Sequence, residues 1–186
     1  HCNDMVVAED GTAWVGNFGF DLHAREPFRN TELIRVDPNG EVSIAAEDLG
    51  FPNGTVITPD GRTLIIAESF AGRLSAFDIA DDRSLGGRRI WAQLPEGQIP
   101  DGICLDAEGG IWVASPRGNA CLRVLEGGTV TDAVALDRGA FACMLGDGDR
   151  RTLYICTAED SDPAKSHSRS GRIERLRVEV PGVGWP

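Results

Sequence analysis

The 186-residue sequence is short of basic side chains and has no long apolar run. It contains 18 Lys and Arg against 29 Asp and Glu, which gives a formal net charge of −11. Nucleic acids and anionic membranes are bound through clustered Lys and Arg, so this balance argues against both as partners. No apolar stretch reaches the roughly 18 residues that a membrane span requires, so we expect no membrane partner.

Several common site signatures are also missing. The chain has five cysteines but no CxxC pair and no Cys–His spacing typical of zinc sites. No Gly-rich phosphate loop follows a strand pattern, and no serine lies in a nucleophile elbow. Cys104, Cys143 and Cys156 fall within apolar runs, where a free thiol behaves as a small hydrophobe. We interpret all five cysteines as reduced and expect a cytoplasmic location.

What the sequence does contain is a unit repeated three times. Each copy begins with a polar pair, which is Asn3-Asp4, Asn53-Gly54 or Asp101-Gly102, and continues with two short apolar runs joined by a turn. The pairs are 50 and 48 residues apart (from 3 to 53 and from 53 to 101). A strand repeat of that length is typical of propeller blades. In a fourth, weaker copy, Phe141 takes the place of the polar residue.

The remaining patterns predict strands and no helix of useful length. Short apolar or alternating runs, bounded by Gly, Pro, Asp or Asn, recur through each unit, although only three are recognisable in the fourth. Units of four antiparallel strands are the blades of a propeller. We therefore predict an all-β fold, a β-propeller that forms a single domain over residues 1–186, with units near 1–47, 48–97, 98–138 and 139–180.

The in-phase polar residues are candidate metal ligands. The innermost strand of each blade lines the central channel, so Asn3, Asn53 and Asp101 would converge at one mouth of it. Amide and carboxylate oxygens suit a hard cation such as Ca²⁺ better than Zn²⁺. The alternative is that Asn-Gly and Asp-Gly are simply turn dipeptides, and the residues alone leave both interpretations open. A second in-phase set, which includes Asp60-Gly61, is assigned to hairpin turns.

Asp101 is the only carboxylate among the three candidates. A bound cation would polarise a carbonyl and lower the pKa of bound water, and Asp101 could both bind the cation and take up the proton. His1 lies two residues before Asn3 and so on the approach to the same mouth. Asp106 is expected at a strand end away from the metal, so we expect Asp106→Asn to change stability only modestly.

Together these motifs resemble the gluconolactonase family, which includes the senescence marker proteins (regucalcins) and the luciferin-regenerating enzymes. The resemblance rests on four segments: Asn3–Val7, Trp14–Asp21, Phe51–Gly54 and Pro100–Asp106. It extends from residue 1 to about residue 178. It implies a six-bladed propeller with one divalent metal in the central channel, and hydrolysis of lactones or, in some relatives, of phosphoesters.

The resemblance also implies roles for individual residues. Asn53 and Asp101 match metal ligands, and Asp101 matches the proposed general base. Asn3 matches a position that binds the metal in some members and substrate or water in others. Asp21 matches an acidic residue near the substrate in a lid loop, and His1 stands where sugar-lactone members have a substrate-contacting Arg. That difference at His1 argues against an aldonolactone substrate.

The family's remaining ligand, a Glu in its first blade, has no counterpart in this sequence. The chain thus resembles the C-terminal two-thirds of a family member. We expect an upstream segment of the same propeller, or a partner, to complete the ring and supply the Glu.

Three functions remain open at this point. The first is a lactonase-type hydrolase of small-molecule lactones or esters with one divalent metal, Ca²⁺ favoured and Zn²⁺, Mg²⁺ or Mn²⁺ as alternatives. The second is a non-catalytic propeller that binds Ca²⁺ or another protein. The third is a phosphotriesterase-like hydrolase that uses the same metal site.

Overall fold

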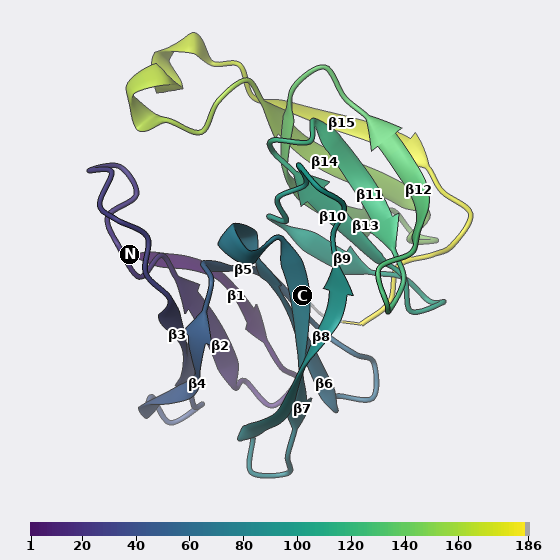
Figure 1. The fold of residues 1–186 in the computed structure, drawn as a ribbon. Helices are drawn as coiled ribbons and strands as arrows, with labels where there is room; N and C mark the ends of the chain where they lie inside the picture. Colours follow the sequence, from purple (N-terminus) through teal and green to yellow (C-terminus); the bar gives the residue numbers. More distant parts are fainter. Residues whose placement is uncertain (185–186) are drawn as a thin grey trace.

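Four antiparallel sheets make up the computed structural model, which describes residues 1–184 (Figure 1). Their strands are β1 (Cys2–Val7), β2 (Ala13–Asn17), β3 (Thr31–Val36) and β4 (Val42–Leu49); β5 (Pro52–Ile57), β6 (Thr63–Glu68), β7 (Arg73–Ile79) and β8 (Leu85–Gln93); β9 (Ile103–Leu105), β10 (Ile111–Ser115), β11 (Ala120–Val124) and β12 (Val130–Ala135); and β13 (Gly139–Gly146), β14 (Thr152–Ala158) and β15 (Arg172–Arg177). The predicted all-β propeller is confirmed, with three strands in the fourth sheet.

Helical structure within residues 1–184 is limited to two 3-10 turns, η1 (Ser69–Ala71) and η2 (Pro163–Ser168). In that part of the chain, no helix has the length and apolar character needed to cross a membrane. The expected unit boundaries are close, although β4 runs two residues past the predicted end at residue 47. The hairpin assignment at Asp60-Gly61 is also confirmed, because Gly61 has a φ of +70° in the turn between β5 and β6.

The sheets follow one another along an arc, like consecutive blades (Figure 1). Their innermost strands meet in chain order, β1 against β5, β5 against β9 and β9 against β13. Strand alternation explains how a middle blade packs on both neighbours. In β6, Leu64 and Ile66 pack toward the first blade, while Ile65 and Ala67 pack toward the third. The continuous apolar run of β6 therefore has both of its faces buried.

Glycines allow the inner strands to come together. A Cβ atom on Gly54 would lie 2.5 Å from the carbonyl oxygen of Asp101, and one on Gly102 would lie 2.7 Å from Cα of Ala142. The Gly54 N–H donates to the Asp101 carbonyl at 3.1 Å, and the Gly102 N–H donates to the Phe141 carbonyl at 2.9 Å. These glycines therefore serve contact between blades, and the turn interpretation of their dipeptides is wrong.

Asp106 differs from the expectation of a mild strand-end position. It is fully buried, and its carboxylate accepts a hydrogen bond from Arg123 Nε at 2.6 Å and one from the Gly110 N–H at 2.9 Å. Removing the charge from a buried ion pair leaves its partner uncompensated, which is strongly destabilising. Asp106 consequently stabilises the third blade and cannot serve as a neutral control for the site.

Candidate functional site

Irregular strand pairing falls at the in-phase positions of three blades. The register shifts at Asn3-Asp4 in β1, at Asn53-Gly54 in β5 and at Phe141 in β13. A β-bulge redirects side chains and is common beside binding sites. In the third blade, β9 begins only at Ile103, and the Asp101 N–H and the Gly102 carbonyl before it both bond to Ala114 of β10, each at 2.9 Å. The pairing is therefore irregular at the same position in every blade.

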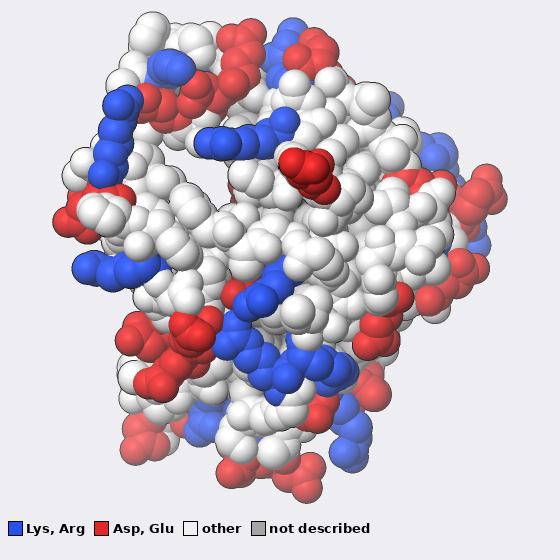
Figure 2. All heavy atoms as spheres, in the orientation of Figure 1, with Lys and Arg blue, Asp and Glu red and all other residues white. Residues whose placement is uncertain are grey.

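A cleft of about 810 Å³ lies at this level of the arc, and Asn53, Asp101 and Phe141 line it together. We call it the central cleft. Its other walls come from η1, from the connection between β8 and β9, and from the loops that follow β2 and β14. Figure 2 shows the surface hollowed between these last two loops. The structure thus brings two of the three predicted ligands into one cavity.

The Asn53 side chain is 5% exposed and is held in a fixed orientation. Its Nδ2 donates to Ser69 Oγ at 3.1 Å, and the Ser69 hydroxyl in turn donates to the Pro100 carbonyl at 2.7 Å. Because the amide nitrogen is bound in this way, the Oδ1 oxygen is the end of the side chain left to accept a ligand. Ser69 therefore couples the Asn53 amide to the segment that carries Asp101.

The central cleft disfavours the charged form of the Asp101 carboxyl group. Burial raises its pKa to about 7, the negative charge of Asp4 adds to the rise, and hydrogen bonds from Asn53 and the Gly102 N–H oppose it. Among residues 1–184, no Lys or Arg is near enough to contribute to this balance. A carboxylate without a basic partner, beside a second carboxylate, is an environment that a cation would stabilise.

These residues fit a hard divalent cation. Asn53 Oδ1 and the Asp101 carboxylate are oxygen donors of the kind that Ca²⁺ accepts. Within the described residues, no group of three or more His, Cys, Asp and Glu side chains could hold a metal, so a site here depends on amide oxygen. Asn3 lies beside this pair, because its Nδ2 donates to the Pro52 carbonyl at 3.1 Å.

His1 and Asp21 lie elsewhere. Both line a separate pocket of about 580 Å³, where His1 Nε2 and Asp21 Oδ2 are 3.9 Å apart. The residue after Asp21, Leu22, does line the central cleft. The loop that contains Asp21 and Leu22 therefore borders both cavities.

Sequence analysis missed the groups that support the site. Glu68 is fully buried and accepts hydrogen bonds from the Gly50 N–H at 2.8 Å and from Arg73 at 2.9 Å. It thereby fixes the chain just before Phe51 and just before Ser69. No sequence signal marked Glu68. The aromatic groups beside the site did have a signal, since five of the seven phenylalanines lie between residues 18 and 70.

Comparison with known proteins decides the family. The family profile described as "SMP-30/Gluconolactonase/LRE-like region" matches residues 1–159. The chain belongs to this family. The resemblance inferred from the sequence motifs is thereby confirmed.

Individual relatives agree with this assignment. The chain is 28% identical to a 6-deoxy-6-sulfogluconolactonase of Pseudomonas putida over 99% of its own length and 64% of the relative's. A luciferin-regenerating enzyme superposes with a TM-score of 0.82 at 21% identity, over 99% of this chain and 64% of that one. A calcium-binding protein, regucalcin, from Agrobacterium tumefaciens superposes with a TM-score of 0.79 at 22% identity, over 100% and 63%. At these identities the two structures establish the fold alone.

The coverage of the relatives is partial. The chain spans 64% and 61% of the first two curated relatives that it matches, and so less than two thirds of their length. The activity of a whole family member is therefore a matter for proposal.

Proposed function

We propose that the protein is a metal-dependent hydrolase that opens lactones or related esters, with one divalent cation, Ca²⁺ favoured, in the central cleft. The observation that carries this proposal is the convergence of Asn53 and Asp101, from successive blades, on one cavity without a basic partner for the carboxylate. The sulfogluconolactonase name of one relative and the calcium-binding description of another support the reaction class and the cation.

In this proposal Asn53 Oδ1 and the Asp101 carboxylate hold the cation, with Asn3 next to them. When bound, the cation would act as a Lewis acid toward the substrate carbonyl. Asp101 would accept the proton from the attacking water as the general base. The bond between the acyl carbon and the ring oxygen then breaks, the departing ring oxygen takes the proton back from Asp101, and the product is a hydroxy acid. Ser69 keeps the Asn53 amide oriented throughout.

The cleft side formed by the first blade would contribute further substrate contacts. We assign these to Asn3, His1 and Asp21, of which the last two face each other in the adjoining pocket. The five cysteines are free, which supports a reducing compartment, and we propose the cytoplasm. We also propose that an upstream segment or a partner covers the open faces of the outer blades.

Two measurements on the intact protein test this function. Elemental analysis should find about one divalent cation per chain, and Asn53→Ala should lower that content. A panel of lactones, carboxylic esters and phosphotriesters should then show metal-dependent lactone opening that EDTA abolishes. Cation binding without turnover would instead indicate a binding propeller, and turnover of phosphotriesters alone would indicate the phosphotriesterase-like alternative.

A further inference from the structure

Five phenylalanines form one continuous aromatic surface beside the central cleft. We call this surface the phenylalanine wall; its members are Phe18, Phe20, Phe28, Phe51 and Phe70. Phe18 stacks on Phe51 with ring centroids 4.6 Å apart, and Phe28 stacks on Phe70 at 5.0 Å with an angle of 3° between the rings. The wall joins the loop after β2 to the start of β5 and to η1.

Core packing accounts for only part of this wall. Phe20 and Phe51 are 5% and 6% exposed, but Phe28 and Phe70 remain 46% and 50% exposed. Adjacent exposed rings form an apolar patch, and such patches mark sites of contact with other molecules. Phe51 also has a φ of +64°, a conformation that is a true outlier for a bulky residue and is retained where the surroundings enforce it.

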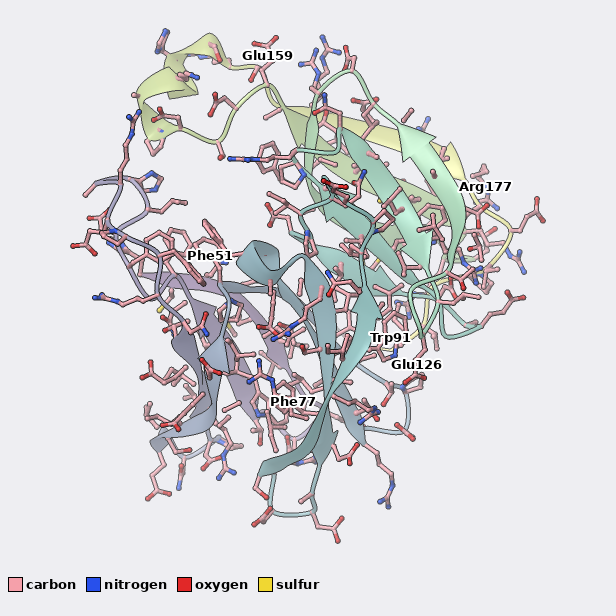
Figure 3. All side chains as sticks on the ribbon, viewed as in Figure 1. Phe51, Phe77, Trp91, Glu126, Glu159 and Arg177 are labelled. Carbon is pink, nitrogen blue, oxygen red and sulfur yellow. The ribbon has the colours of Figure 1, made fainter. Side chains whose placement is uncertain are left out.

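The wall directly adjoins the polar floor of the cleft. Phe51 and Phe70 both line the central cleft with Asn53 and Asp101. Phe51 precedes Asn53 by two residues, and Phe70 follows Ser69, whose Oγ accepts a hydrogen bond from Asn53 Nδ2. In Figure 3, Phe51 stands at the edge of the opening between the loops that follow β2 and β14. A molecule whose carbonyl lies at Asn53 and Asp101 would therefore place its nearest substituent against aromatic rings.

The charged side chains around the cleft nearly balance when the proposed cation is counted, so the wall is the feature that restricts the substrate. Glu96, Glu159 and Asp160 line it against a single basic residue, Arg117. Asp160 pairs with Lys165, and the proposed divalent cation at Asp101 offsets two further negative charges, so the net charge of the loaded cleft is close to zero. The wall itself offers no hydrogen-bond donor or acceptor for sugar hydroxyls.

We propose that the substrate is a neutral lactone or ester with an alkyl or aryl substituent, which packs on the phenylalanine wall while its carbonyl lies at Asn53 and Asp101. This inference rests on the proposed hydrolase function and narrows its substrate class. Polyhydroxylated lactones are poor substrates by the same argument.

The test compares kcat/KM of the intact protein for a pentyl-substituted δ-lactone, the unsubstituted δ-lactone and gluconolactone. The pentyl lactone should be preferred, because each methylene in a hydrophobic pocket contributes about tenfold or more to discrimination. Phe70→Ala, at a half-exposed position, should lower the ratio of pentyl to unsubstituted kcat/KM by about tenfold. Phe28→Ala provides a second variant of the stacked pair. The matched control is Ile173→Ala, at a 73% exposed apolar position on β15 outside the cleft, and it should leave the ratio unchanged.

The outcomes separate the wall from the hydrolase function. A preference for gluconolactone, or a ratio that neither phenylalanine variant lowers, would overturn the wall as a specificity surface while leaving the lactonase function intact. If no lactone is opened, binding of pentyl-substituted and unsubstituted δ-lactams, which resist hydrolysis, decides the matter. Tighter binding of the pentyl lactam that is lost in Phe70→Ala would support the wall, and equal affinities would overturn it.

Discussion

At the residue scale, Asp101 carries the proton chemistry that we propose. Asp101→Asn keeps the shape and one oxygen donor but removes charge and basicity. We expect kcat to fall by about 10²–10⁴ and cation content to fall as well, measured by steady-state kinetics and elemental analysis. The control is Asp60→Asn at the exposed hairpin turn of the second blade, where both quantities should stay near wild type. Full turnover and cation content in Asp101→Asn would remove Asp101 from the site.

The raised pKa of Asp101 also predicts a pH dependence of stability in the metal-free protein. Its folded-state pKa of about 7 lies above the ordinary value of 3.8, so the native state binds the proton more tightly than the unfolded state does. The stabilising contribution of that proton is complete below about pH 4 and is lost as the pH rises to about 7. Urea unfolding in EDTA should therefore show wild type losing stability relative to Asp101→Asn across this window. Parallel curves for the two proteins would show that Asp101 has an ordinary pKa.

At the element scale, the contact between inner strands depends on residues without a Cβ atom. In Gly54→Ala the new methyl group would lie 2.5 Å from the backbone oxygen of Asp101, and backbone cannot move aside as a flexible side chain can. We expect a loss of about 1–3 kcal/mol of unfolding free energy, or more, from this overpacking. Gly148→Ala is the control, because nothing lies within 4 Å of a Cβ atom there. Equal stability of the two variants in urea titrations would contradict close packing at this position.

The third blade depends on a buried ion pair. Asp106 is fully buried and Arg123 is 7% exposed, so neither charge can be compensated by water when its partner is removed. Asp106→Ala should cost about 3–5 kcal/mol of unfolding free energy, with the loss visible in chemical denaturation. Replacing the exposed Glu108, which also pairs with Arg123 at 3.2 Å, should cost about 1 kcal/mol or less. A mild effect of Asp106→Ala would show that Arg123 finds another partner.

At the scale of the whole molecule, the two outer blades each present a face with no neighbouring blade (Figure 1). On the first blade, Met5 and Val7 are 51% and 40% exposed, and on the fourth, Met144 and Ile173 are 38% and 73% exposed. Alternation explains the exposure of Met5, Val7 and Met144, because their strand neighbours Val6 and Cys143 are buried in the cores between blades. Such faces favour association.

We therefore expect residues 1–186, studied alone, to self-associate with rising concentration in sedimentation experiments. Met144→Lys together with Ile173→Lys should weaken that association, because it places charge on one apolar face. Ile90→Lys, at a 58% exposed apolar position on the second blade, is the matched control and should have little effect. A chain that stays monomeric at all concentrations would show that these faces do not drive assembly.

The sequence by itself determined the architecture and two residues of the candidate site. Strand-length apolar runs repeated at a period of about 50 residues leave few solutions other than blades, and residues in phase must converge around a common axis. Asn53 and Asp101 could be found in this way because their position depends on the repeat alone. For the same reason, the apolar Phe141 could be placed at the equivalent position of the fourth blade.

Only the tertiary structure decided what surrounds those residues. Hydrogen bonds link Asn53 through Ser69 to the Pro100 carbonyl, Glu68 is fully buried, and Phe28 stacks on Phe70. These contacts join segments that no repeat relates. The function of Gly54 was hidden for a similar reason, because Asn-Gly has the same appearance in a turn and at a contact between blades. Asp106 was misjudged because a carboxylate at a strand end is exposed or buried according to its partner, and Arg123 lies on another strand. Periodicity fixes where a residue falls in its blade, whereas burial and pairing depend on the neighbouring chain segments that folding brings to it.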